Sequence, residues 1–214
     1  MTGLGEKLGY YLTHPEAIIY GVATALLYPV LFLEVFALLV AAYEAGRFCV
    51  EVFKRRRARK KLDVEAAAVA VAQATGTDKR TAALGFLGSM GPSPIARTVA
   101  SSLEHQSTVT RSHVLKALAD ADLESVRVLE RTRMLMRVGP ILGLMGTLIP
   151  ISPALVALAS GDVQQLSDNL VIAFSTTVVG LLIGSIGYIV TAVRDRHHQQ
   201  DLTDIEYVFD HLGG

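Results

Sequence analysis

The chain has 214 residues, of which 51% are hydrophobic, and its mean hydropathy is +0.41. Its 20 basic and 20 acidic side chains balance to a net charge of zero, so the composition gives no support for nucleic acid as a partner. A single cysteine, Cys49, excludes an internal disulfide framework, and no Cys/His cluster has the spacing of a metal site. We therefore expect an all-α membrane protein without a metal or a cofactor.

The first apolar run covers Ala17–Ala42 and is interrupted only by Pro29 and Glu34. The residues before it lack the basic region and the cleavage site of a secretory signal, which favours a retained transmembrane helix over residues 17–46. Residues 1–16 would then form an extracytoplasmic N-terminal segment. Glu34 is a candidate intramembrane polar residue, and three roles are open to it: direct ion transfer, a bond to a neighbouring helix, or snorkelling.

Basic residues are concentrated between the first and the second apolar runs. They lie near the two ends of this segment and comprise Arg47, the run Lys54–Lys61, Arg127, Arg131, Arg133 and Arg137. The positive-inside rule places residues 47–137 in the cytoplasm, the N-terminus outside and the C-terminus inside. The Lys54–Lys61 run could also contact nucleic acid, but beside a membrane helix we favour anionic membrane lipids.

The cytoplasmic region is expected to be helical and to extend the membrane helices. Leu62–Thr75 is rich in Ala and Val, glycines and Gly91–Pro94 indicate turns, and His113–Met136 has apolar residues at helical spacing. No breaking residue precedes Gly139-Pro140, so this last helix could continue into the second span as one rod. Ser93 suits either a regulatory loop or a plain turn, and we favour the turn.

The second and third apolar runs, Val138–Ala159 and Leu170–Val193, contain no Lys, Arg or His. They are about 22 and 24 residues long, enough to cross a hydrocarbon core of about 30 Å. We predict transmembrane helices over residues 138–160 and 170–193, joined by an extracytoplasmic loop over 161–169. A cytoplasmic C-terminal helix over 194–214 follows, and we interpret His197-His198 as a surface pair at a helix end rather than a metal site.

Hydroxyl groups and glycines form two motifs inside these runs, Gly143-Leu-Met-Gly-Thr147 and Ser175-Thr-Thr-Val-Val-Gly180. Hydroxyls gain nothing from lipid, so they indicate a polar surface inside a bundle or pore, formed by Thr147, Ser175, Thr176 and Thr177. Alternatively, a membrane threonine bonds a carbonyl one turn earlier in its own helix. The glycines predict close helix packing at Gly143, Gly146, Gly180, Gly184 and Gly187.

Gly139–Thr147, followed about thirty residues later by Ala173–Leu181, resembles the signature of the MotA/TolQ/ExbB proton-channel family. The resemblance is closest to the ExbB/TolQ branch, whose members have three spans. It implies a multi-pass protein of the inner (cytoplasmic) membrane, a homopentamer around a pore that holds a dimeric single-span partner of the ExbD, TolR or MotB kind. The partner carries a membrane aspartate, and ion flux drives mechanical work. Thr147 and Thr177 align with the two pore threonines of the family, with Thr176 beside them.

Neither of these two apolar runs contains a carboxylate, although ion passage through a bilayer needs a titratable or coordinating group. We therefore expect a helix of a partner protein to supply the carboxylate. Family members usually carry a glutamate five residues before the third-span threonine, where this chain has Ile172. No phosphate loop or nucleophile motif indicates an enzyme. The alternative to a channel is a non-conducting membrane scaffold that recruits a protein through its cytoplasmic helices, and the sequence leaves open whether the ion is a proton or sodium.

Overall fold

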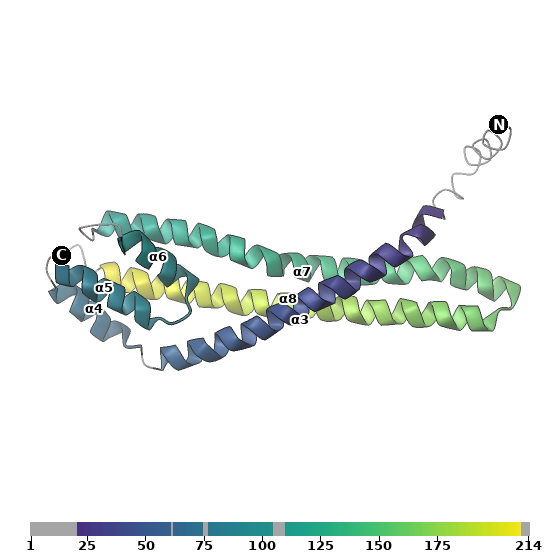
Figure 1. Ribbon diagram of the computed structural model, residues 1–214, viewed down its shortest axis with the longest axis horizontal. Helices are drawn as coiled ribbons and strands as arrows, with labels where there is room; N and C mark the ends of the chain where they lie inside the picture. The colour runs from purple at the N-terminus through teal and green to yellow at the C-terminus, as the bar shows by residue number, and fades with distance from the viewer. Residues whose placement is uncertain (1–20, 61, 75–76, 105–109, 211–214) are drawn as a thin grey trace, which may run out of the picture. The chain divides into compact units, whose positions relative to one another are not determined.

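The computed structural model describes residues 21–60, 62–74, 77–104 and 110–210 (Figure 1). Every regular element in these ranges is an α-helix, which confirms the all-α prediction. The helices are α3 (Leu27–Arg59), α4 (Val64–Gln73), α5 (Thr77–Ser89), α6 (Pro94–Glu104), α7 (Arg111–Ser160) and α8 (Val163–Asp210). The N-terminal segment expected over 1–16, the start of the first predicted span and the last four residues lie outside the described ranges.

Three helical stretches are long and apolar enough to cross a membrane: Gly21–Arg59, Ser112–Ser160 and Val163–Asp210. They have 39, 49 and 48 residues. At a rise of about 1.5 Å per residue, each is far longer than a hydrocarbon core of about 30 Å. Each helix that spans a membrane must therefore continue beyond it.

Helix α7 is continuous from Arg111 to Ser160, so no break separates residues 113–136 from the predicted second span. It includes Pro140, Pro150 and Pro153, each of which lacks the N–H that would bond the carbonyl four residues earlier. Packing of the apolar faces holds the helix together across these missing bonds.

The connection between α7 and α8 is shorter than the expected loop over 161–169. Gly161 ends α7 in the left-handed conformation, with φ of 76°, and the Asp162 N–H donates to the Ala157 carbonyl at 2.9 Å. Asp162 then caps α8, because its carboxylate accepts from the Gln165 N–H at 3.0 Å. Residues 163–169 are helical as a result. The helix expected over 194–214 is the end of α8, which continues unbroken to Asp210.

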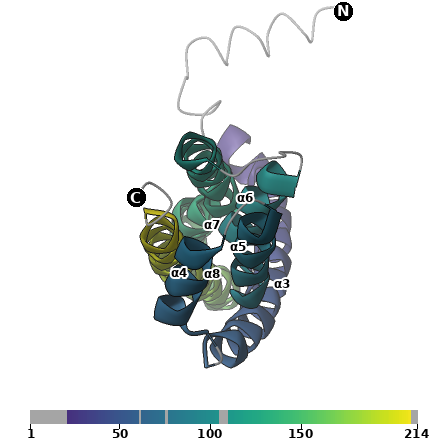
Figure 2. The same cartoon turned by 90° about the vertical axis from the view of Figure 1, so that its left-hand side faces the viewer.

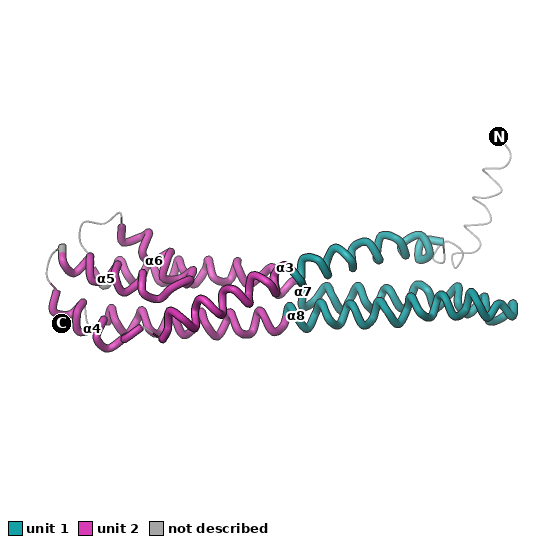
Figure 3. Tube along the Cα trace, turned by 60° about the horizontal axis from the view of Figure 1, so that its bottom comes forward, with its two compact units in different colours: residues 1–42, 135–187 teal, residues 43–134, 188–214 magenta. Residues whose placement is uncertain are grey.

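The chain divides into two compact units (Figure 3). Unit 1 comprises residues 1–42 and 135–187, and unit 2 comprises residues 43–134 and 188–214, so α3, α7 and α8 each contribute to both. The core of unit 1 is formed by Val30, Ala37, Ala41, Leu135, Leu142 and Ile183. Large apolar side chains are exposed around it, among them Phe32, Phe36, Leu148 and Phe174. Such a surface is typical of a protein covered by lipid or by other subunits.

Unit 2 groups the short helices α4, α5 and α6 with the adjoining parts of α7 and α8 (Figure 2). Its largest fully buried side chains come from four of these helices: Val71, Ile95, Val99, Leu103, Val114, Ile205 and Val208. Ser93 caps α6 by accepting from the Ala96 N–H at 3.2 Å. Ser93 is itself buried, which agrees with a structural turn.

Candidate functional site

Helices α7 and α8 approach to backbone contact inside unit 1. A Cβ atom added to Gly180 would lie 2.6 Å from the Gly143 Cα, and one added to Gly146 would lie 2.6 Å from the Thr176 Cβ. At Gly184 the added atom would lie 2.8 Å from the Pro140 ring. Only glycine fits such distances. Gly187 is buried in the next turn of α8.

Gly139 belongs to the same contact, although the sequence indicated it only as part of a helix break. A Cβ atom there would lie 2.8 Å from both the Gly180 carbonyl oxygen and the Gly184 nitrogen. Gly139, Gly143 and Gly146 are spaced by four and then three residues, which places all three on one face of α7. This spacing was the sequence feature that could have identified Gly139 as a packing residue.

The contact brings the two hydroxyl motifs together. A Cβ atom on Gly143 would lie 3.1 Å from the Thr176 carbonyl oxygen and 3.4 Å from the Thr177 Cα, and Thr147 follows Gly143 by one turn. Thr176 is buried, Thr147 and Thr177 are partly buried, and Ser175 is exposed. The predicted pore residues therefore occupy neighbouring turns of two packed helices.

Each threonine hydroxyl donates to its own helix. Thr147 donates to the Leu144 carbonyl at 2.7 Å, and Thr176 and Thr177 donate to the Ala173 carbonyl at 2.9 and 3.2 Å. These bonds use the hydroxyl proton and leave the oxygen able to accept. At Thr147 and Thr177, which keep some exposure, a protonated group from another molecule can donate to that oxygen.

Glu34 lies on the buried face of α3 in unit 1. Its side chain is 3% exposed, and its Oε1 atom has no hydrogen-bond partner. Val30, Glu34, Ala37 and Ala41 recur at helical spacing, which places the carboxyl on the face that forms the unit 1 core. The structure therefore excludes the snorkelling role among the three left open by the sequence.

Unit 2 contains buried charged groups that the sequence did not indicate. Arg194 on α8 donates to Glu44 at 3.1 Å and to Glu51 at 3.0 Å, both on α3. Arg55, from the cationic run Lys54–Lys61, is buried and pairs with the buried Asp201, which also accepts from Ser93 at 2.6 Å. Arg55 is therefore not available for the contact with lipid that was expected of this run.

The prediction of a surface pair at His197-His198 is wrong for His198, which is 2% exposed and lies well inside α8. Burial lowers the pKa of both imidazoles below the ordinary value, and Arg55 adds to this effect at His197. Both are therefore neutral at pH 7. Periodicity could not reveal this burial, because the residues that cover His198 are distant in sequence.

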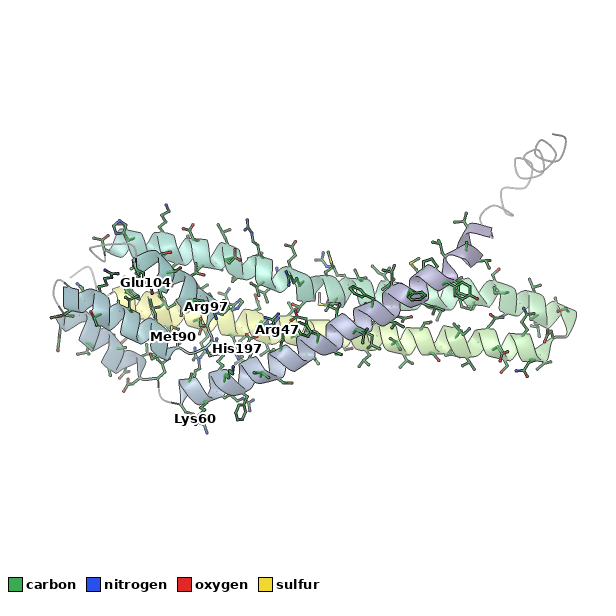
Figure 4. All side chains as sticks on the ribbon, viewed as in Figure 1. Arg47, Lys60, Met90, Arg97, Glu104 and His197 are labelled. Atoms are coloured by element: carbon green, nitrogen blue, oxygen red, sulfur yellow. The ribbon has the colours of Figure 1, made fainter. Side chains whose placement is uncertain are left out.

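A cavity of about 940 Å³ lies in unit 2. Its ionisable lining comes from α3, α6, α7 and α8 and includes Glu44, Arg47, Glu51, Lys54, Arg97, Glu124, Arg127, Arg131, Arg194 and His198. Figure 4 labels Arg47, Arg97 and His197 in this part of the molecule. Several of the cations are neutralised within the unit, as Arg194 is by Glu44 and Glu51 and Arg127 is by Glu124 at 3.7 Å.

Comparison with protein families matches residues 82–206 to the MotA/TolQ/ExbB proton channel family. The chain belongs to this family. The MotA/TolQ/ExbB match covers more than half of the sequence, including all of α6 and α7 and nearly all of α8. No curated protein and no solved structure gives a significant match.

Membership in the MotA/TolQ/ExbB family confirms the resemblance based on the two glycine and threonine motifs, both of which lie within the match. It identifies a membrane protein with a general role in ion conduction or motor action, in a family of channels rather than enzymes. Helix α3 and Glu34 lie outside the matched residues.

Proposed function

We propose that the chain is the channel subunit of an ion-driven motor of the ExbB/TolQ branch. Five copies would surround a pore that holds a dimeric, single-span partner of the ExbD, TolR or MotB kind, which carries a membrane aspartate. The observation that carries this proposal is the family match over residues 82–206, which includes two packed helices with threonine motifs and no carboxylate in their apolar parts.

The threonines suit an acceptor role in such a pore. An ion crossing the bilayer needs a titratable or coordinating group, and hydroxyls do not titrate near neutral pH. Thr147 and Thr177 each keep an oxygen that can accept a hydrogen bond after donating to their own helices. A protonated aspartic acid on the partner would donate to these oxygens, and Thr176 and Ser175 would line the adjoining wall.

The proposed topology places the N-terminus outside, the C-terminus inside and unit 2 in the cytoplasm of a cell with an inner membrane. The support is the distribution of the cations, together with helices longer than a bilayer. The exposed apolar side chains of unit 1 would face lipid and neighbouring subunits. Exposed basic residues such as Arg56 and Arg57 would face anionic headgroups.

The test measures proton flux with a pH-sensitive dye in liposomes that contain the chain and the partner encoded beside it. We expect Thr147→Val or Thr177→Val to abolish flux while the pentamer persists, because valine keeps the shape and removes the acceptor. Ser185→Ala is a matched control, since Ser185 is an exposed hydroxyl on α8 that donates to the Leu181 carbonyl at 2.8 Å. Unchanged flux in both threonine variants, or an assembly other than five in particle averaging, would contradict the proposal.

A non-conducting scaffold is the second candidate. One observation favours it: the hydroxyls of Thr147, Thr176 and Thr177 donate within their own helices, and the glycines around them pack helices together. In that case the liposomes would show no flux above protein-free vesicles with any partner, while the threonine variants would still bind the partner normally.

A further inference from the structure

Glu34 combines burial with an incomplete set of hydrogen bonds. Its side chain is 3% exposed, and Oε1 has no partner, while the backbone of Gly180 on α8 lies close to the carboxyl. An ionised carboxylate has about four lone-pair sites to satisfy. One backbone contact leaves most of them empty.

No opposite charge compensates Glu34 among the described residues of unit 1. The other ionisable side chains there are Tyr28 on α3, Arg137 on α7, Asp162 in the turn and Asp168 on α8. All four are exposed, whereas Glu34 is buried. An unpaired charge inside hydrocarbon costs several kcal/mol, whereas a neutral carboxylic acid needs only ordinary hydrogen bonds. The surroundings therefore stabilise the protonated form.

Glu34 shares its face of α3 with residues of the hydrophobic core of unit 1. A desolvated alkali cation needs several oxygen atoms to replace its hydration shell. The core side chains that share this region are hydrocarbon, and they comprise Val30, Ala37, Ala41, Leu135, Leu142 and Ile183, with Val179 and Met145 packed against them. A neutral carboxyl among these groups holds its proton without any further ligand.

The contact with Gly180 also places Glu34 near the threonine motif. Gly180 follows Thr176 by four residues and Thr177 by three on α8, which is about 6 Å and about 4.5 Å along the helix axis. Gly180 is in turn the residue that touches Gly143 on α7. The Glu34 carboxyl thus lies near the contact between α7 and α8, the two helices that carry the threonine motifs.

We propose that Glu34 binds an exchangeable proton inside unit 1 and passes it to and from the channel during ion transfer, which makes α3 part of the pathway. This inference rests on the proposed channel function. It supplies from within the chain a second titratable carboxyl besides that of the partner, and it identifies the transported ion as a proton.

The first experiment is infrared spectroscopy of the purified full-length protein in lipid, without the partner. We expect a carboxylic-acid C=O band at neutral pH that disappears in Glu34→Gln, moves in Glu34→Asp, and shifts when H2O is replaced by D2O. Glu130→Gln, a change at an exposed glutamate on α7, is the control and should leave the band intact. Absence of a protonated Glu34 band, or a band that never shifts in D2O, would overturn the proposal.

A second measurement uses wild-type protein and therefore does not depend on the folding of a variant. Dicyclohexylcarbodiimide attacks protonated carboxyls in apolar surroundings, and peptide mass spectrometry locates the adduct. We expect modification at Glu34 that decreases as the pH rises and is the same in sodium and potassium chloride at equal concentration. Protection by sodium, or modification confined to other carboxyls, would contradict a proton site at Glu34.

Flux in liposomes separates this inference from the proposed function. We expect Glu34→Gln to lose proton flux while the pentamer and partner binding persist, and Glu34→Asp to retain part of it. Normal flux in Glu34→Gln would overturn the role of Glu34 and leave the channel proposal standing. Absence of flux in the wild type would instead overturn the channel proposal, whatever the spectroscopy shows.

Discussion

Replacing Gly180 with alanine tests the backbone contact between α7 and α8 directly. The new Cβ atom would lie 2.6 Å from the Gly143 Cα, 2.7 Å from the Gly139 carbonyl oxygen and 2.8 Å from the Gly143 nitrogen. All three are backbone atoms, so no flexible side chain can move aside. Ordinary contact begins at 3.4 Å, and the two helices must therefore separate by about 1 Å.

Two opposing effects determine how far Gly180→Ala changes the free energy of unfolding. Overpacking of a close contact destabilises by roughly 1–3 kcal/mol, whereas alanine in place of glycine inside a helix stabilises by about 1 kcal/mol. The free energy of unfolding should then fall by roughly 0–2 kcal/mol in Gly180→Ala. Gly46→Ala on α3 is the matched control, because nothing lies within 4 Å of its added Cβ atom. Only the favourable term applies there, so the two variants should differ by about 1–3 kcal/mol.

The assay is thermal or denaturant unfolding of both variants in the same detergent, followed by circular dichroism. Gly143→Ala provides a milder case, since its nearest atoms would be 3.1 Å away. We expect stability to decrease in the order Gly46→Ala, Gly143→Ala, Gly180→Ala. Equal stabilisation by Gly180→Ala and Gly46→Ala would refute the contact, and with it the alignment of the threonine motifs that depends on it.

Two further predictions concern the buried groups of unit 2. Asp201→Ala should destabilise the protein by about 3–5 kcal/mol, because it leaves the buried Arg55 without an opposite charge. The control Asp204→Ala removes a more exposed partner of Arg59 and should cost about 1 kcal/mol or less. Similar melting temperatures for the two variants would be inconsistent with this reasoning. Because burial lowers the pKa of His198, the unfolded chain takes up the proton before the folded chain does as the pH falls below about 6.5. The free energy of unfolding should therefore decline below this pH, and it should decline less steeply in His198→Gln. Identical pH dependence of unfolding in the two proteins would contradict a buried His198.

Part of the site could be predicted because its residues are local in sequence. The motifs around Thr147 and Thr177 lie in short stretches, and their order is enough for the family to be recognised and then confirmed. The turn at Gly161-Asp162 was also predictable, since a glycine followed by an aspartate is typical of one helix ending and another beginning. The prediction of a loop over 161–169 gave too little weight to Gly161 as a helix end and to Asp162 as a helix cap.

Residues with charged side chains were the least predictable. Arg55 counted toward the orientation of the chain, yet it is buried, as is Arg194, in an ion pair whose acidic partner is more than a hundred residues away in sequence. His198 was expected at a surface for the same reason. Composition identifies a cation, but it does not identify the acid that a distant helix will place beside it.

By itself, the sequence determined the helical class, the three apolar stretches and the family, because hydrophobic length and short motifs depend on neighbouring residues. Tertiary structure alone decided which polar groups lie inside. The periodicity of α3 is compatible with Glu34 on any face, and only the packing of unit 1 leaves it 3% exposed with an unpaired oxygen. Burial depends on which helices meet, and that is a property of contacts between segments far apart in the chain.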